Sequence, residues 1–147
     1  MLSGSERAAR YESRRRADGY RKVHLWVPAA RAGEIAGIAA RLRRDHEAAR
    51  QRRSLRDRLR RLEPILRDYG IVHLALTGAA ARGELKPRES TDLVADFTPG
   101  CFLYASERET LERDLSARLG RPATLTDGML LSPPERRRLA AGQVRVF

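Results

Sequence analysis

Residues 77–97, TGAAARGELKPRESTDLVADF, combine a turn that opens with a glycine and a segment with the character of a β-strand. The run IVHLALT at 71–77 leads into this turn. Both it and TDLVADF at 91–97 are short, apolar and bounded by turn-forming or polar residues, as strands are. A basic stretch lies between them. The pattern predicts a strand, a turn into a short helix, and a second strand that begins with one carboxylate, Asp92.

The rest of this half of the chain supplies elements that can pack on the two strands. Leucines recur at helical spacing over 55–69 and over 103–119, so we expect a helix in each range. PATLTD at 122–127 predicts a third short strand, and SPPERRRLAAG a last helix that Ser132 caps. QVRVF at the end of the sequence is suited to an edge strand. His73 falls inside the first strand, where we expect it to be packed.

The first part of the chain follows a different pattern. GYRKVHLWVP at 19–28 alternates apolar and polar residues, which predicts a half-buried strand, and a helix with an apolar stripe follows. The arginine-rich residues 3–18 predict a frayed helix or an arm that orders on a partner. The stripe disappears over 43–54, and the leucines then restart in a new phase, as in a separate helix. We therefore predict an α+β protein of two domains, residues 1–54 and 55–147.

Charge is distributed unevenly along the chain. Residues 1–67 carry 19 Arg or Lys against 8 Asp or Glu, a net charge of +11, whereas residues 68–147 carry 11 of each kind. Such asymmetry predicts a polyanionic partner, with nucleic acid ahead of an anionic membrane. Because 28 of the 30 basic residues are arginine, a genome-wide bias toward arginine is an alternative source of the charge. Such a bias does not explain why the second half is neutral.

Three further features bear on the cellular setting. Cys101 is the single cysteine, so neither an intramolecular disulfide nor a cysteine-based metal site can form. We expect it to be a buried structural thiol. The N-terminal residues lack the apolar core of a secretory signal, and no apolar run approaches membrane-spanning length. We expect a cytoplasmic protein without a membrane partner.

The basic strand and the helix after it resemble a DNA-binding class. RRRADGYRKVHLWVPAARAGEIAGIAARL, residues 14–42, is similar to ribbon-helix-helix proteins and above all to MazE-like antitoxins. The resemblance implies a homodimer whose two strands pair into a ribbon that enters the major groove of duplex DNA. The turn usual between the two helices of that motif is missing around 43–54. The DNA-binding residues expected on this basis are Arg14, Arg15, Arg16, Arg21, Lys22, His24 and Trp26.

The second half resembles the small nucleotidyltransferases of the polymerase-β superfamily, and above all the minimal ones encoded as antitoxins beside HEPN toxins. The similarity runs from about residue 55 to 147 and rests on the glycine turn, on ARGE at 81–84 and on the order of the elements. In that family a Gly-Ser turn and helix start can hold a triphosphate on backbone amides. An Asp-x-Asp pair on the second strand and a third acid on the next strand bind two metal ions. The resemblance implies a nucleotidyltransferase-like fold for residues 55–147.

The catalytic pattern of that family is incomplete in this sequence. Gly78 matches the glycine of the turn, but Ala79 replaces the serine. Asp92 matches the second acid of the pair. Ser90 and Thr124 stand where the other two acids would be. We therefore expect a vestigial site that has no catalytic residue.

Other carboxylates are poorly placed to restore the site. Asp96 lies four residues beyond Asp92, about 13 Å along a strand, which is too far for a shared metal ion. Glu89 precedes the strand, and Asp127 lies beyond the expected ligand position. A single carboxylate provides too few ligands for Mg²⁺, so we expect no metal and no cofactor. Asp92 is the ligand if any metal binds.

The mouth of this site, defined as Gly78, Arg82, Lys86 and Arg88, still carries cations. In the resembled family the mouth faces the acceptor hydroxyl of a partner protein, so we expect these residues to bind an anion or a protein partner. The alternative is structural: Gly78 makes a tight strand-to-helix turn, and Arg82 pairs with a local acid.

The preferred interpretation is an antitoxin-like DNA-binding repressor that carries a degenerate nucleotidyltransferase domain and binds a toxin protein. The first alternative is an active enzyme that transfers AMP from ATP, with Mg²⁺, to a HEPN-type toxin. A second alternative is an accessory protein that binds RNA. For the basic strand itself, a further alternative is that it docks on the second domain with Trp26 in the core.

Overall fold

The computed structural model describes residues 3–147 and contains two compact units, one ending at Ile38 and the other comprising Ala39–Phe147. The boundary predicted after residue 54 falls inside the second unit. One unbroken helix, α2 (Ala32–Arg60), begins in the first unit and continues in the second. The separate helix predicted from residue 55 is therefore wrong. The phase of the leucines changes because different parts of one helix meet different surroundings.

The first unit contains helix α1 (Gly4–Ala17), a segment without regular secondary structure over 20–28, the 3₁₀ turn η1 (Ala29–Arg31) and the start of α2. Helix α1 lies within residues 3–18, where the sequence predicted a frayed helix or an arm that orders on a partner. Ser3 caps α1, and hydrogen bonds from its backbone and hydroxyl lower the pKa of Glu6. The predicted strand is absent from this single chain, since among the described residues no other strand pairs with residues 20–28.

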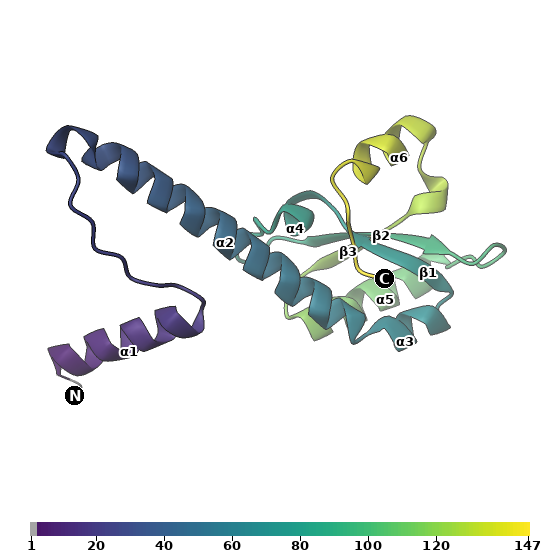
Figure 1. Ribbon diagram of the computed structural model, residues 1–147. Coiled ribbons are helices and arrows are strands. Elements are labelled where there is room, and N and C mark those ends of the chain that lie inside the picture. The colour runs from purple at the N-terminus through teal and green to yellow at the C-terminus, as the bar shows by residue number, and fades with distance from the viewer. Residues whose placement is uncertain (1–2) are drawn as a thin grey trace. The chain divides into compact units, whose positions relative to one another are not determined.

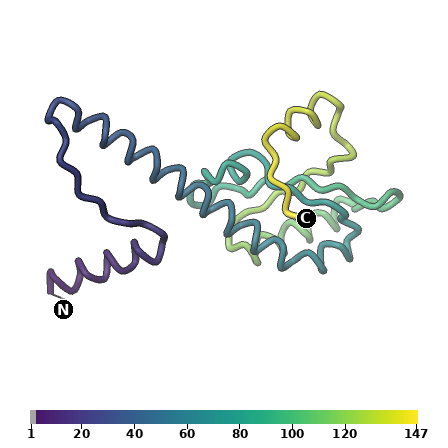
Figure 2. Tube along the Cα trace, in the orientation of Figure 1, coloured from purple at the N-terminus to yellow at the C-terminus, as the bar shows by residue number. Residues whose placement is uncertain are grey.

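The second unit is built on a four-stranded sheet. Its strands are β1 (Ile71–Leu76), β2 (Thr91–Phe97), β3 (Ala123–Asp127) and β4 (Val144–Arg145), in the order β3-β2-β1-β4. β2 and β3 run parallel, whereas β1 is antiparallel to both β2 and β4. All four strands lie where the sequence predicts them. The trace in Figure 2 shows the end of the chain returning to lie beside β1, where the Leu74 amide donates to the Phe147 carbonyl at 3.2 Å.

Helices cover the two faces of this sheet unequally (Figure 1). Helices α3 (Glu63–Asp68) and α5 (Ala105–Leu119) lie on one face, and α6 (Pro133–Ala140) lies on the other side together with the 3₁₀ turn η2 (Gly128–Leu130). The apolar core joins the sheet to the leucines of the helices, including Leu55, Leu59, Leu66, Leu111, Leu115 and Leu119. The observed architecture is α+β, as predicted.

The cap of α6 agrees with the sequence prediction, whereas the burial of His73 and of Cys101 differs from it. Ser132 caps α6 as predicted, and hydrogen bonds from its side chain and backbone lower the pKa of Glu135. His73 was predicted to be packed, but its side chain is exposed because it faces the sheet surface that α6 covers only in part. Cys101 is half-buried instead of buried, with Sγ 3.6 Å from the Tyr69 carbonyl. Among residues 3–147, no helix combines the length and the apolar character needed to cross a membrane.

Candidate functional site

The glycine turn places backbone beside the carboxylate of β2. β1 leads through Thr77 into the five-residue helix α4 (Gly78–Arg82), and Gly78 has a φ of +56°. The amide and hydroxyl of Thr77 both donate to the Asp92 carbonyl, at 3.0 and 3.2 Å. A Cβ added to Gly78 would lie 3.4 Å from Asp92 Oδ2. The turn and the start of β2 therefore form one compact corner.

The three positions that carry acids in the resembled family come together at this corner. β2 and β3 pair with Asp92 opposite Thr124. Thr124 Oγ1 donates to Asp92 Oδ1 at 2.8 Å, and Ser90 Oγ lies 3.4 Å from Thr124 Oγ1. A carboxylate and two hydroxyls thus occupy the place that the resemblance assigns to three carboxylates. We name Ser90, Asp92 and Thr124 the vestigial triad, after the sequence prediction that they are the remnant of such a site.

These side chains do not fit the magnesium ions of the resembled family. The triad supplies a single negative charge, and one oxygen of that carboxylate already accepts a hydroxyl hydrogen. Two of the acids considered as substitutes have other partners: Glu89 Oε2 accepts from the Lys86 amide, and Asp127 Oδ1 accepts from the Met129 amide, each at 2.8 Å. No group of three or more His, Cys, Asp or Glu side chains is placed to hold a metal ion anywhere in residues 3–147.

The cationic side chains of the mouth lie on α4 and on the segment that links it to β2. Arg82 Nε donates to Glu84 Oε2 at 2.7 Å, so the pairing of Arg82 with a local acid is observed. Both side chains remain about 60% exposed (61% and 60%). Lys86 and Arg88 are exposed, and Arg88 has a φ of +66°, which is uncommon for a residue with a Cβ. The mouth is an accessible basic surface.

Helix α2 holds this segment from the side. Gly83 has a φ of +75°, and a Cβ on it would lie 1.9 Å from the Ala48 carbonyl oxygen. Gln51 and Leu85 exchange two hydrogen bonds, from Gln51 Nε2 to the Leu85 carbonyl at 2.9 Å and from the Leu85 amide to Gln51 Oε1 at 2.8 Å. Sequence reasoning missed this contact. The one signal for it is the glycine inside ARGE, which permits the close approach of two backbones.

The N-terminal arginines form part of a small ordered cluster around the end of α1. The Arg15 guanidinium lies 4.2 Å from the centre of the Tyr20 ring and 5.7 Å from that of Tyr11, within cation–π distance. Glu12 lies between two other cations, with Lys22 Nζ at 3.3 Å and Arg16 Nη2 at 3.9 Å. Some of the residues predicted to bind DNA are thus held in place by contacts with a neighbouring glutamate and with neighbouring tyrosines.

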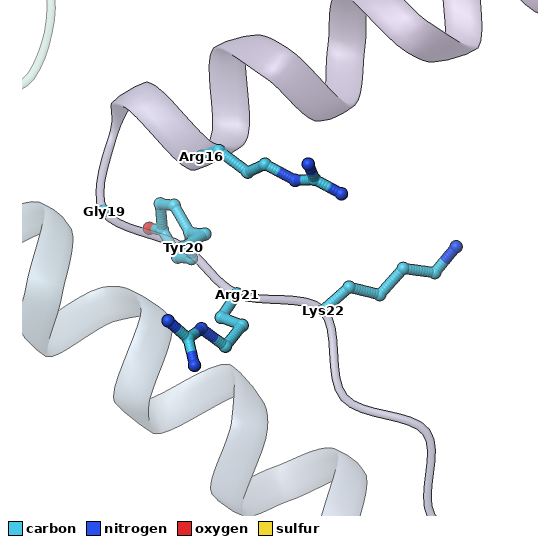
Figure 3. A pocket seen from close by; sticks show the side chains of 5 residues that line it. All are labelled: Arg16, Gly19, Tyr20, Arg21 and Lys22. Carbon is cyan, nitrogen blue, oxygen red and sulfur yellow. The ribbon is translucent and has the colours of Figure 1, made fainter.

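A shallow hollow of about 570 Å³ lies at the turn after α1, lined by Arg16, Gly19, Tyr20, Arg21 and Lys22. In Figure 3 the side chains of Arg16 and Lys22 extend toward the same side, whereas Arg21 points away from them. Arg14 is exposed on α1, and His24 is exposed beyond the turn. Trp26 is fully exposed, which contradicts the alternative that places it in a core.

Comparisons with known proteins find likeness at the level of solved structures. No family model and no curated protein matches the chain. A structure described as that of a candidate minimal nucleotidyltransferase is 24% identical, with a TM-score of 0.55 over 63% of this chain and 93% of the other. A toxin–antitoxin complex with AMP-PNP gives 17% identity and a TM-score of 0.53 over 63% and 72%. A mutant MntA–HpeT toxin–antitoxin complex gives 15% and 0.50 over 59% and 70%.

These similarities establish a shared fold. The chain has the fold expected of a nucleotidyltransferase, as those proteins do. The matches cover 59% to 63% of this chain, which agrees with a similarity that lies mostly in the second unit. The identities are below 25%, so they do not transfer an activity or a partner.

Proposed function

We propose that this protein is an antitoxin-like DNA-binding repressor whose second unit is a catalytically degenerate nucleotidyltransferase that binds a protein partner. The observation that carries this proposal is the vestigial triad, in which Asp92 is the single carboxylate and Thr124 donates to it at 2.8 Å. The corner has the backbone shape of a nucleotide-handling site but lacks the ligands that its chemistry requires.

The argument for degeneracy is electrostatic. Transfer of a nucleotidyl group with two metal ions needs several carboxylates, because the ions must stay bound while charge develops on the attacking and leaving oxygens. Mg²⁺ prefers a near-octahedral set of oxygens at about 2.1 Å. Neutral hydroxyls at Ser90 and Thr124 contribute no charge to balance two divalent ions. What these residues can do is hydrogen-bond to one another and to a neutral or weakly charged group.

The partner-binding part of the proposal rests on the exposed mouth. Arg82, Lys86 and Arg88 offer cations on a segment that α2 holds in place through Gly83 and Gln51. Two of the structurally similar proteins are toxin–antitoxin complexes. A domain that has this basic surface but lacks carboxylates to bind metal ions is suited to binding an acidic patch of a toxin.

The DNA-binding part rests on charge and exposure in the first unit. The arginines of α1 other than the half-buried Arg15 are exposed, and Val23 and Leu25 are 68% and 67% exposed. The segment over 20–28 thus combines exposed apolar side chains with a backbone that has no partner strand among residues 3–147. Pairing with the same segment of a second chain satisfies both and presents Lys22, His24 and Trp26 to a major groove. We propose a homodimer that binds duplex DNA in this way.

Nucleotide transfer is the most direct test. Incubation of the protein with labelled ATP, Mg²⁺ or Mn²⁺, and the product of the neighbouring gene is expected to leave every protein unlabelled. Label that appears on a protein and is lost in Asp92→Ala overturns the degenerate assignment. As a companion, the triple change Ala79→Ser, Ser90→Asp and Thr124→Asp rebuilds the pattern of the resembled family, and metal binding by this variant can be followed by calorimetry.

Partner binding is tested separately by co-purification. The product of the neighbouring gene is expected to co-purify with the full chain, and Arg82→Glu is expected to weaken the complex because it sets like charges against each other. Arg108→Glu on α5, an exposed arginine outside the mouth, is the matched control. Equal loss in both variants contradicts a role for the mouth.

A further inference from the structure

A second cavity, of about 340 Å³, opens on the sheet face that α6 covers in part. It is separate from the vestigial triad, although both lie on the same face of β2. His73 and Ala75 of β1 lie beside Asp96 and Val94 of β2 and form its floor. Arg136, Arg145, Gln143 and Leu131 also line the cavity. Its volume is at the lower end of the range of small-molecule sites.

The chain makes room in this cavity for a carboxylate. A Cβ on Gly128 would lie 2.4 Å from Asp96 Oδ1, so a larger residue at 128 would displace the carboxylate. Gly128 is not in the left-handed region, which means that space, not backbone conformation, favours glycine there. Within residues 3–147 the half-buried Asp96 carboxylate has neither a hydrogen-bond nor an ion-pair partner. Asp96 is therefore available to pair with a cationic group of a ligand.

Two guanidinium groups line the same cavity, and each is positioned by a neutral group. Arg136 Nη2 donates to the Gly128 carbonyl at 2.9 Å. Arg145 Nη2 lies 3.0 Å from His73 Nδ1. A guanidinium cannot accept, so Nδ1 is the acceptor and His73 is the neutral tautomer with hydrogen on Nε2. Among the described residues neither arginine forms an ion pair with a carboxylate, which leaves two positive charges and one negative charge facing the cavity.

We propose that this cavity binds a free acidic α-amino acid, glutamate or aspartate. The ammonium group of such a ligand pairs with Asp96, and its two carboxylates pair with Arg136 and Arg145, to which a carboxylate can bind through two parallel hydrogen bonds. The ligand carries a net charge of −1 and the cavity +1, so the charges balance. A simple dicarboxylate would leave Asp96 unpaired beside like charge. A simple amine would leave both arginines without an anion.

Calorimetry on the full chain separates these possibilities. Glutamate is expected to bind, and glutarate, which differs by the loss of the ammonium group, is expected to bind at least about tenfold more weakly, because a charge-assisted hydrogen bond contributes about 1.5–3 kcal/mol. AMP serves as the probe for a nucleotide site. Absence of glutamate and aspartate binding at up to about 10 mM, equal binding of glutarate, or binding of AMP alone overturns the proposal.

Two variants connect the binding to the residues named. Asp96→Asn keeps the shape of the side chain and is expected to remove the preference for glutamate over glutarate. Gly128→Ala is expected to weaken glutamate binding by displacing Asp96, whereas Gly142→Ala, whose Cβ would meet nothing within 4 Å, is expected to leave it unchanged. Circular dichroism and thermal melting establish that each variant is folded, and Asp96→Asn alone decides the outcome if Gly128→Ala fails to fold. An unchanged preference in Asp96→Asn overturns the proposal.

Discussion

The two compact units differ in what their apolar side chains touch. Helix α1 has no buried residue, and Trp26 in the following segment is 104% exposed. In the second unit, by contrast, Leu59, Leu76 and Val146 are fully buried in one core that joins the helices to the sheet. The excess positive charge is shared between the units, because residues 1–38 carry 8 Arg or Lys against 4 Asp or Glu and residues 39–147 carry 22 against 15.

This difference distinguishes a unit with its own apolar core from one whose apolar side chains are exposed. Burial of apolar area is the main favourable term in folding, and helices as short as α1 are marginal in water on their own. The second unit meets this requirement within its own sequence. The first unit buries little apolar area by itself, and the proposed DNA-bound homodimer would cover its apolar and cationic side chains.

The largest effect is expected from a comparison of two leucines on helix α2, one of them buried and the other exposed. Leu59→Ala removes a fully buried side chain and is expected to lower the free energy of unfolding by about 2–5 kcal/mol. Leu42→Ala changes the same residue type where it is 60% exposed, and its effect is expected to stay within about 0.5 kcal/mol. Urea unfolding of the two variants measures the difference. Equal destabilisation contradicts the description of α2 as a helix with one buried and one exposed part.

A smaller effect is expected at the contact between α2 and the ARGE segment. Gly83→Ala combines a left-handed backbone with a Cβ that meets the Ala48 carbonyl, and we expect it to destabilise the fold by about 3 kcal/mol. Gly120→Ala has a similar φ of +64° but meets nothing within 4 Å, so about 1 kcal/mol is expected. Thermal melting compares them. If both variants lose the same stability, the strain of a positive φ alone explains the effect of Gly83→Ala, and the contact with α2 contributes little.

DNA affinity is expected to depend on the arginines of α1 and not on those of α5. Replacing Arg14, Arg15 and Arg16 with alanine is expected to weaken binding to all duplex sequences alike and to reduce the slope of log affinity against log salt by about 2–3, because each lost phosphate contact removes about 0.9. The control replaces Arg108, Arg113 and Arg118 of α5 with alanine and removes the same charge. Fluorescence anisotropy over a salt series gives both slopes, and equal slopes contradict a DNA-binding first unit.

The elements of the second unit were predictable because their signals are local. Apolar runs gave β1 and β2, and the helical spacing of leucines gave α5. The convergence of Ser90, Asp92 and Thr124 followed from the resemblance, which places them on adjacent strands. The hydrogen bond from Thr124 to Asp92 did not follow, because it depends on the rotamer of a side chain that the resembled family does not have.

The errors arose where contacts are polar or involve another molecule. The compact second unit includes residues before 54, because α2 contacts the ARGE segment through the amide of Gln51 and the backbone of Ala48, and neither contact produces an apolar stripe in the sequence. His73 was expected to be packed because an apolar run does not reveal which sheet face a helix leaves open. The strand predicted over 20–28 has no partner strand among residues 3–147, and the proposed homodimer would supply one.

The smallest effect is expected from an acid inside the basic cluster. Glu12 lies between Lys22 and Arg16, at 3.3 and 3.9 Å, and occupies the neighbourhood that a DNA phosphate would take. Glu12→Gln removes the competing charge, so DNA affinity at low salt is expected to rise about two- to threefold, in keeping with the 0.2–1 kcal/mol typical of exposed ion pairs. Glu34→Gln breaks the exposed pair with Arg31 in the same unit and is the control, expected to change affinity less. The advantage of Glu12→Gln should shrink as salt screens both competitors. Weaker binding by Glu12→Gln would show instead that Glu12 positions Lys22 and Arg16 for the phosphate, and that this cluster is preorganised by its own acid.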